Sequence, residues 1–209
     1  MYKHFIWDFD GTLFDTYPMI VKLHKDILLE HGINEDMDMI LKMLKEQSAK
    51  HVLRYYKEKY NITTEDFYEE YWKKERTEEY VNIAKPIENA IEVCKYIISK
   101  GYKNYIISNR SDSIIFFLNR YDLLKYFEEI TFVNPTMKVK PSTDMFIYTM
   151  NKYNINKEET LSIGDTNLDL IASTKMGIDF CMYKPFSEKL DYLPKYVIDS
   201  MEELYEIIT

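Results

Sequence analysis

Two aspartates follow an apolar run close to the start of the chain. The segment HFIWDFDGT (4–12) places Asp8 and Asp10 on either side of Phe9 and directly before Gly11. One carboxylate can attack phosphorus or bind a hard cation such as Mg²⁺, while a second can act as general acid and base. An Asp-Gly pair after a strand is commonly just a turn, so this segment predicts phosphate chemistry only if other polar residues join it.

Polar residues also end or follow three later segments. They are Ser108 and Asn109 at the end of KNYIIS (103–108), Lys140 in KVKP (138–141), and Asp165 and Asp169 in GDTNLD (164–169). Ligands of open parallel sheets bind outside the carboxyl ends of the strands, where the strand order reverses. If these residues follow parallel strands, they converge on one crevice. Taken alone, Ser108-Asn109 would be a helix N-cap, and GDTNLD would be a capped helix start with an acidic first turn.

The chain from Lys85 onward alternates strand-like and helix-like segments, as parallel sheets with helical crossovers do. Strands are predicted over 4–8, 103–108, 129–133, 159–164, 178–183 and 196–199. Helices are predicted over 86–101, with Pro86 at the first helical position, and over 111–123, 142–154, 167–177 and from about Met201. The sequence therefore predicts an α/β core with a doubly wound, Rossmann-like parallel sheet.

Residues 15–84 interrupt this alternation. Helical periodicity runs through three segments there, and no convincing strand is present. These segments are 18–32, 37–60 and 64–81, the last starting near Thr64, Glu65 and Asp66. We therefore expect an all-helical domain of residues 15–84, inserted into a core formed by residues 1–14 and 85–209. Its histidines, His24, His31 and His51, are expected at surfaces or interfaces and not as metal ligands.

Composition excludes several classes of partner. The 209 residues carry a net charge of −8, with a pI near 5.1, which argues against binding to nucleic acid. No apolar run approaches the roughly 20 residues of a membrane span, and residues 1–9 lack the features of a signal peptide. We expect a cytoplasmic protein without a membrane partner. Cys94 and Cys181 lie in separate apolar runs, which predicts two buried thiols.

The four motifs together resemble the signature motifs of a known superfamily. DFDGT, ISN, KP followed by an acid-x-Phe, and GDTNLD are similar, in the same order, to the motifs of the haloacid dehalogenase (HAD) superfamily. The helical insertion resembles the cap domain of its phosphoglycolate-phosphatase-like branch, so the resemblance covers nearly the whole chain. It implies a magnesium-dependent phosphatase that hydrolyses a small phosphorylated metabolite through an aspartyl phosphate.

The resemblance also implies roles for the acidic residues. Asp8 is expected to be the nucleophile, and Asp10 to protonate the leaving oxygen and later to deprotonate water. The Mg²⁺ ligands would be the Asp8 side chain, the backbone carbonyl of Asp10, and Asp165. Asp169 is expected to act through water or by holding Lys140.

The phosphoryl oxygens need hydrogen-bond donors and a fixed positive charge. Candidate donors are Gly11, Thr12, Ser108 and Asn109, and Lys140 would supply the charge, with Lys138 left in solvent. Arg110 could touch the leaving group or pair with Asp112. In the inserted domain, Tyr17, Lys50 and Arg54 are candidates for substrate contact, although a solvated helix face explains each of them better.

Single residues distinguish this chain from proteins that carry similar motifs but have other functions. Dehalogenases lack the second aspartate that is present here as Asp10, and ion pumps have Lys where Phe9 stands. A phosphosugar mutase of the β-phosphoglucomutase type shares every core residue and stays open as an alternative. A regulatory module that accepts phosphate without rapid turnover is a second alternative, which motif order and the helical insertion disfavour. The chain is expected to be a monomer or a homodimer.

Overall fold

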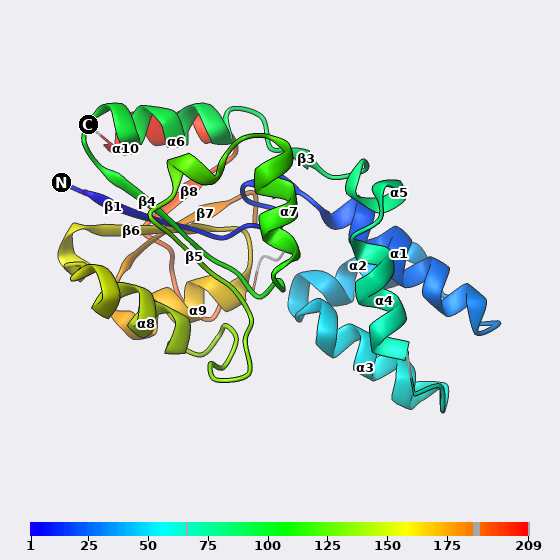
Figure 1. Cartoon of the computed structure of the whole chain (residues 1–209). Helices are drawn as coiled ribbons and strands as arrows, with labels where there is room; N and C mark the ends of the chain where they lie inside the picture. The colour runs from blue at the N-terminus through cyan, green and yellow to red at the C-terminus, as the bar shows by residue number, and fades with distance from the viewer. Residues whose placement is uncertain (66, 186–188, 209) are drawn as a thin grey trace. The chain divides into compact units, whose positions relative to one another are not determined.

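The computed structural model describes residues 1–65, 67–185 and 189–208, which form two compact units. One unit, called the core unit below, consists of Met1–Phe14 and Pro86–Thr209. The other, called the helical unit, is Asp15–Lys85 (Figure 1). Two short strands, β2 (Phe14–Asp15) and β3 (Lys85–Pro86), pair with each other where the chain passes from one unit to the other.

A six-stranded parallel sheet forms the centre of the core unit. Its strands are β1 (His4–Trp7), β4 (Lys103–Ile107), β5 (Glu129–Thr131), β6 (Thr160–Gly164), β7 (Asp179–Tyr183) and β8 (Tyr196–Ile198). Their order in the sheet is β5-β4-β1-β6-β7-β8. The chain thus winds outward from β1 on one side and then from β6 on the other, which is the doubly wound, Rossmann-like arrangement. The winding direction therefore reverses between the adjacent strands β1 and β6.

Helices cover both faces of this sheet. They are α6 (Ala90–Ser99), α7 (Ser113–Arg120), α8 (Asp144–Tyr153), α9 (Asn167–Met176) and α10 (Leu204–Ile208), with short 3₁₀ turns at Leu124–Tyr126, Lys157–Glu159 and Met201–Glu203. α6 and α10 contact each other on one face, and α8 and α9 contact each other on the other face (Figure 1). The central strands are consequently apolar on both sides, and Phe5, Ile6 and Trp7 are almost completely buried.

The buried side-chain amide of Asn104 links three elements of the core unit. Asn104 of β4 is fully buried, and its Oδ1 accepts a hydrogen bond from Trp7 Nε1 at 2.9 Å. Its Nδ2 donates to the carbonyl oxygen of Cys94 in α6, also at 2.9 Å. Because a buried amide must satisfy its hydrogen bonds inside the protein, Asn104 fixes β1, β4 and α6 relative to one another.

The predicted helices of the core unit are present but shorter. The first helix begins at Ala90 and not at Pro86, because Pro86 belongs to β3 and Asn89 adopts a left-handed conformation with φ of 61°. Gly177, with φ of 70°, ends α9 as its position in the sequence predicts. The N-cap position of α7 is held by Asp112, so Ser108 and Asn109 do not cap that helix.

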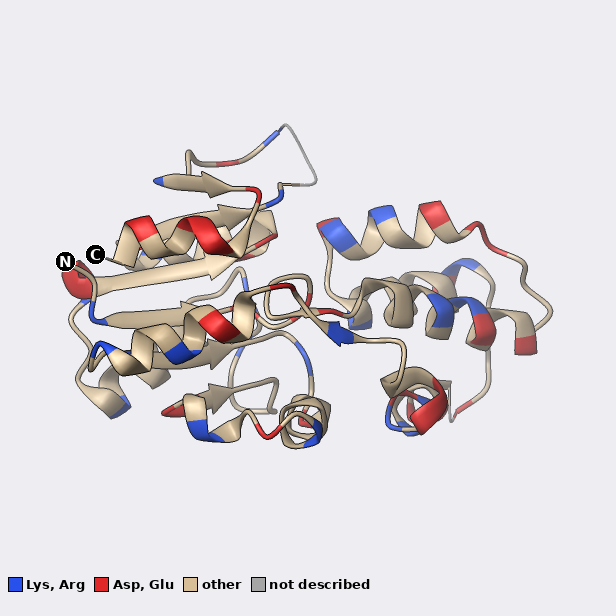
Figure 2. Ribbon diagram, turned by 90° about the horizontal axis from the view of Figure 1, so that it is seen from above, with Lys and Arg blue, Asp and Glu red and all other residues tan. Residues whose placement is uncertain are grey.

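The helical unit contains five helices among its described residues. They are α1 (Tyr17–Glu30), α2 (Met37–Glu46), α3 (Ala49–Lys59), α4 (Phe67–Glu75) and α5 (Glu78–Val81). Two predicted segments are each divided in two, because Ser48 and Thr77 adopt extended backbone conformations before α3 and α5. Asp66, predicted near the start of the last segment, lies outside the described residues. Figure 2 shows acidic and basic residues interspersed along these helices.

His24 lies in the interior of the helical unit and not at a surface. Its side chain is fully buried, and its ring packs edge-on against that of Tyr71 with 5.0 Å between centroids. Nδ1 lies 2.8 Å from the carbonyl oxygen of Ile20, and Nε2 lies 3.4 Å from that of Ala49. Burial lowers the pKa of His24 to about 4, although the two carbonyl groups oppose this shift.

The stability of the helical unit is therefore expected to fall in mild acid. The unfolded chain binds a proton on His24 below about pH 6.5, whereas the folded unit does so only near pH 4. Lowering the pH from 7.5 to 5.5 should cost roughly 1 kcal/mol of unfolding free energy through this residue. Urea titrations read out by hydrogen exchange of the α1 amides measure this cost. His24→Asn should remove most of this cost. His51→Asn should remove less, because partial burial, Arg54 and Lys50 lower the pKa of His51 at an exposed site without the full burial of His24.

No helix in the described ranges combines the length and the apolar character needed to cross a bilayer.

Candidate active site

The predicted polar residues lie at the carboxyl ends of three neighbouring strands. Asp8 follows β1, Ser108 follows β4, and Asp165 follows β6. The backbone N–H of Asp8 donates to the carbonyl oxygen of Ile163 at 2.8 Å, so parallel pairing continues to the nucleophile candidate itself. The winding direction reverses between β1 and β6, and the site therefore lies where ligands bind in folds of this kind.

A tight turn follows Asp8. The carbonyl oxygen of Phe9 accepts from the N–H groups of Leu13 and Phe14, at 3.1 and 3.0 Å, and the N–H of Gly11 donates to the carbonyl of Phe14 at 2.7 Å. Gly11 has φ of 78°, a conformation that side chains disfavour. The rings of Phe9 and Phe14 stack at 4.8 Å, so the turn that carries Asp10 is anchored in the apolar core.

Lys140, in the KVKP segment, contacts Asp8 of the DFDGT segment and Asp169 of the GDTNLD segment. Its Nζ lies 2.6 Å from Asp8 Oδ1 and 2.5 Å from Asp169 Oδ1, and it donates to the carbonyl oxygen of Ile107 at 2.8 Å. Lys140 is only 4% exposed, whereas Lys138 is exposed. Burial alone would lower the pKa of Lys140, but Asp169 and Asp8 outweigh burial and raise it, so the ammonium stays charged.

Asn109 positions Lys140 through its backbone. The Asn109 Nδ2 donates to the Lys140 carbonyl oxygen at 3.0 Å, and the Lys140 N–H donates to Asn109 Oδ1 at 2.8 Å. This reciprocal pair joins the loop after β4 to the loop that carries Lys140. The sequence predicts Asn109 as a phosphate donor, and that role stays a prediction. In the structure its side-chain amide holds the neighbouring loop.

Asp169 is held by a capping box at the start of α9. Its Oδ2 accepts from the backbone N–H of Thr166 at 3.2 Å and from the Thr166 hydroxyl, while Oδ1 contacts Lys140. A Cβ on Gly164 would lie 2.8 Å from Asp169 Cβ, so the close approach requires glycine there. Both interpretations of GDTNLD therefore hold, because the segment caps a helix and also places an acid in the site.

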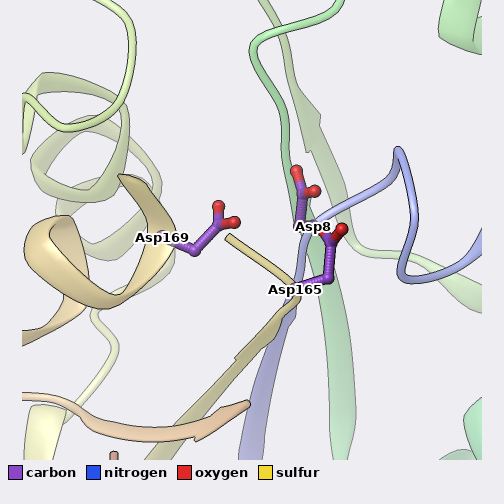
Figure 3. Close-up of side chains that lie close together, drawn as sticks. All are labelled: Asp8, Asp165 and Asp169. Atoms are coloured by element: carbon purple, nitrogen blue, oxygen red, sulfur yellow. The ribbon is translucent and has the colours of Figure 1, made fainter. Parts of the chain in front are cut away.

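Three buried carboxylates gather at this point. Asp8, Asp165 and Asp169 each offer an oxygen within 4.8 Å of the others (Figure 3). The Thr12 hydroxyl donates to Asp165 Oδ1 at 3.3 Å. Burial, and next the charge of Asp169, raise the pKa of Asp8 well above its usual range, although Lys140 opposes this shift. A hard divalent cation would offset the repulsion among the three carboxylates. Their oxygen atoms are the ligands that Mg²⁺ prefers, so the site fits this ion.

Arg110 has a partner that sequence reasoning missed. Its Nε donates to Asp10 Oδ1 at 2.9 Å, and its Nη2 lies 2.8 Å from the same oxygen. The backbone N–H of Arg110 donates to the Ser108 hydroxyl at 3.1 Å. No local pattern predicts this pair, because 100 residues separate Asp10 from Arg110.

The remaining candidates belong to the helical unit. Tyr17 is buried, and the Lys45 ammonium lies 3.6 Å from the centroid of its ring. Lys50 and Arg54 are exposed and stand four residues apart on α3, so they share one face of that helix. Their contact with substrate stays a prediction.

Comparison with known proteins now identifies the family. The family model described as haloacid dehalogenase-like hydrolase matches residues 5–183, most of the chain. The chain belongs to the haloacid dehalogenase-like hydrolases. The resemblance inferred from the four motifs is thereby confirmed, and the protein is a hydrolase of this family.

Individual relatives within the HAD family are distant but cover most of the chain. A protein of Caldanaerobacter subterraneus subsp. tengcongensis with the provisional name pyrophosphatase PpaX is 26% identical, over 97% of this chain and 93% of its own. The phosphoglycolate phosphatase of Aquifex aeolicus is 27% identical, over 82% and 80%. A HAD-like hydrolase of Bacteroides fragilis, also provisionally named, has a solved structure with a TM-score of 0.84 and 21% identity, over 98% and 100%. This last likeness shows the shared fold.

Proposed function

We propose that this HAD hydrolase is a magnesium-dependent phosphatase of small phosphorylated metabolites that works through an aspartyl phosphate on Asp8. The observation that carries the proposal is the buried group formed by Asp8, Lys140 and Asp169, with Asp165 beside it. It combines a carboxylate nucleophile, a fixed cation and oxygen ligands for a divalent ion at one sheet edge. Phosphoryl transfer depends on these components.

Asp8 is suited to nucleophilic attack by its fixed position. Its backbone is held by the sheet, and Lys140 holds its Oδ1, so the carboxylate is oriented before substrate binds. Attack of a carboxylate oxygen on phosphorus forms the aspartyl phosphate and breaks the bond to the leaving oxygen. Water then attacks phosphorus and releases inorganic phosphate together with the restored Asp8 carboxylate.

Asp10 would move the protons in both half-reactions. It stands two residues from Asp8 on the turn, and its side chain is 22% exposed, so a bound substrate or water can reach it. In the first half it would donate a proton to the leaving oxygen, and in the second it would accept one from water. This second carboxylate favours phosphate hydrolysis over dehalogenation.

The Mg²⁺ ion would be held by the Asp8 carboxylate, the Asp10 carbonyl and Asp165. When bound, the ion supplies charge neutralisation that lets an anionic nucleophile approach a phosphoryl group. Lys140 contacts Asp169 Oδ1, and Thr166 donates to Asp169 Oδ2. Because both oxygens already have partners, we propose that Asp169 holds Lys140 and does not bind Mg²⁺ directly. Thr12 contacts Asp165 from the opposite loop and would orient it.

The substrate is proposed to be a small phosphorylated compound, in keeping with the names of the relatives. Pyrophosphate and phosphoglycolate are the first candidates to test, followed by sugar phosphates. We propose that the helical unit acts as a cap that closes over the substrate and excludes water, with Tyr17, Lys50 and Arg54 as candidate contacts. We expect no nucleic-acid or membrane partner.

The test is an assay for released phosphate with a panel of these compounds and nucleotides. We expect release with Mg²⁺ and its loss when the ion is chelated, with return on adding Mg²⁺ back. Conversion of a sugar phosphate without phosphate release would instead favour a mutase. A long-lived phosphoprotein without turnover would favour a regulatory module, and no reaction with any compound would overturn the proposal.

A further inference from the structure

Arg110 makes a bidentate contact with the carboxylate of Asp10. Its Nε donates to Oδ1 at 2.9 Å and to Oδ2 at 3.2 Å, and its Nη2 lies 2.8 Å from Oδ1. The Arg110 side chain is only 2% exposed. A planar guanidinium that meets a carboxylate with two nitrogens fixes the orientation of that carboxylate, which a lysine ammonium does not do.

The guanidinium is itself held in place by surrounding residues. Its Nη1 donates to the Ser113 hydroxyl in the first turn of α7 at 3.3 Å. Its Cζ lies 5.1 Å from the centroid of the Phe117 ring and 5.8 Å from that of Phe9, within the range of cation–π contacts. The backbone N–H of Arg110 donates to Ser108, so the loop after β4 fixes the residue at its base.

Asp10, in contrast, lies on a turn and not in a sheet strand. Its backbone forms a single isolated bridge to Phe14, and its side chain is partly exposed. A short side chain on a turn has several staggered orientations to choose from. A proton donor must lie within hydrogen-bond reach of the reacting oxygen, and an error of about 1 Å can cost 10²-fold in rate.

We propose that Arg110 is a positioning residue that fixes the Asp10 carboxylate for proton exchange with the leaving oxygen. It acts through Asp10 and does not touch the substrate, since its guanidinium is buried against Phe9 and Phe117. This inference rests on the proposed phosphatase function. It goes beyond that function because it assigns orientation of the acid and base to a residue of the loop after β4.

The first test compares Arg110→Met with Arg110→Lys and with Arg120→Met, a matched control at an exposed arginine of α7. Phosphate release should fall roughly 10- to 100-fold in kcat for Arg110→Met, with KM changed less than about threefold. Arg110→Lys should recover part of this loss, and Arg120→Met should match the wild type. Circular dichroism and urea unfolding establish that each variant is folded; if Arg110→Met is not, Arg110→Lys carries the comparison.

The second test uses the chemistry of the leaving group. p-Nitrophenolate leaves without a proton, whereas an alkoxide needs one. Arg110→Met should therefore slow hydrolysis of an alkyl phosphate more than that of p-nitrophenyl phosphate, which a general loss of structure would not do. In an Asp10→Asn background, Arg110→Met should change kcat less than about twofold, because the residue through which it acts has been removed.

The outcomes separate this inference from the proposed function. If the wild type releases phosphate and Arg110→Met behaves like Arg120→Met, the inference fails while the function stands. Equal slowing of both substrate classes, or full additivity with Asp10→Asn, also overturns it. If the wild type releases no phosphate from any compound, the proposed function fails, and the inference fails with it.

Discussion

Replacing Asp8 by Asn is expected to lower kcat for phosphate release by on the order of 10⁶-fold, as loss of a nucleophile does in a well-studied protease. The amide nitrogen is not a nucleophile toward phosphorus, and the neutral side chain is a weaker ligand for Mg²⁺. The amide oxygen can still accept from Lys140, so the fold should persist. Phosphate release by stopped assay measures the loss, and acid-quenched protein should carry no phosphate on the variant.

The same substitution is expected to stabilise the protein when Mg²⁺ is absent. Burial and Asp169 raise the pKa of Asp8, so folding favours the protonated acid over the carboxylate. Above that raised pKa, the ionised Asp8 lowers the free energy of unfolding, and a neutral Asn removes this penalty. In urea unfolding at pH 7.5 with a chelator, the free energy of unfolding of Asp8→Asn should exceed that of the wild type. The difference between the two should become smaller when Mg²⁺ is added.

A matched control for Asp8→Asn is Asp122→Asn in the core unit. Asp122 has 82% of its side chain exposed and adopts a left-handed conformation with φ of 54°, which Asn also tolerates. This variant should keep wild-type activity and near wild-type stability. Retention of phosphate release by Asp8→Asn would refute the assignment of Asp8 as nucleophile, and with it the aspartyl-phosphate mechanism.

The sheet and the convergence of the site were predictable because both depend on short-range patterns. Continuous apolar runs identify strands buried on both faces, and polar residues at their carboxyl ends must meet at one edge of a parallel sheet. Asp8, Ser108 and Asp165 follow three strands that are neighbours in the sheet, and they meet at one edge as predicted. The position of Lys140 directly before Pro141 favours it over Lys138, and Lys140 is the buried one of the two.

What the sequence did not predict depends on tertiary contacts or on single backbone conformations. Arg110 binds Asp10 because two loops meet in space, and neither loop carries a local signal for that pair. The break before α3 depends on an extended Ser48 between two segments with compatible helical periodicity. A polar histidine is expected at a surface or an interface. His24 is buried instead, because backbone carbonyl oxygens inside the helical unit lie within hydrogen-bond distance of its ring nitrogens.

Replacing Lys140 by Met should reduce both activity and stability, for separate reasons. Removing one partner of a buried ion pair leaves an uncompensated charge and costs about 3–5 kcal/mol. Here two buried carboxylates, Asp8 and Asp169, lose the same cation. We also expect kcat/KM to fall roughly 10³-fold, because a fixed charge that stabilises the transition state is lost. Urea unfolding with a chelator and phosphate release with Mg²⁺ measure the two effects.

Lys138→Met is the matched control, because it makes the same change in the same loop at an exposed side chain. It should leave both quantities near the wild-type values. If Lys140→Met were as stable as Lys138→Met, the buried pairs with Asp8 and Asp169 would not contribute to stability. In an Asp8→Asn background the stability cost of Lys140→Met should shrink, because one of the two unpaired carboxylates is gone.

Mg²⁺ should separate the two effects of Lys140→Met. An ion that binds only the folded state stabilises it by about 2.7 kcal/mol at 100 times its dissociation constant. It would offset repulsion among Asp8, Asp165 and Asp169, so much of the lost stability should return. Phosphate release, measured with Mg²⁺, should still lie roughly 10³-fold below the wild type, because the ammonium that held Asp8 Oδ1 at 2.6 Å is absent. Wild-type phosphate release by Lys140→Met in the presence of Mg²⁺ would mean that Lys140 serves the fold alone.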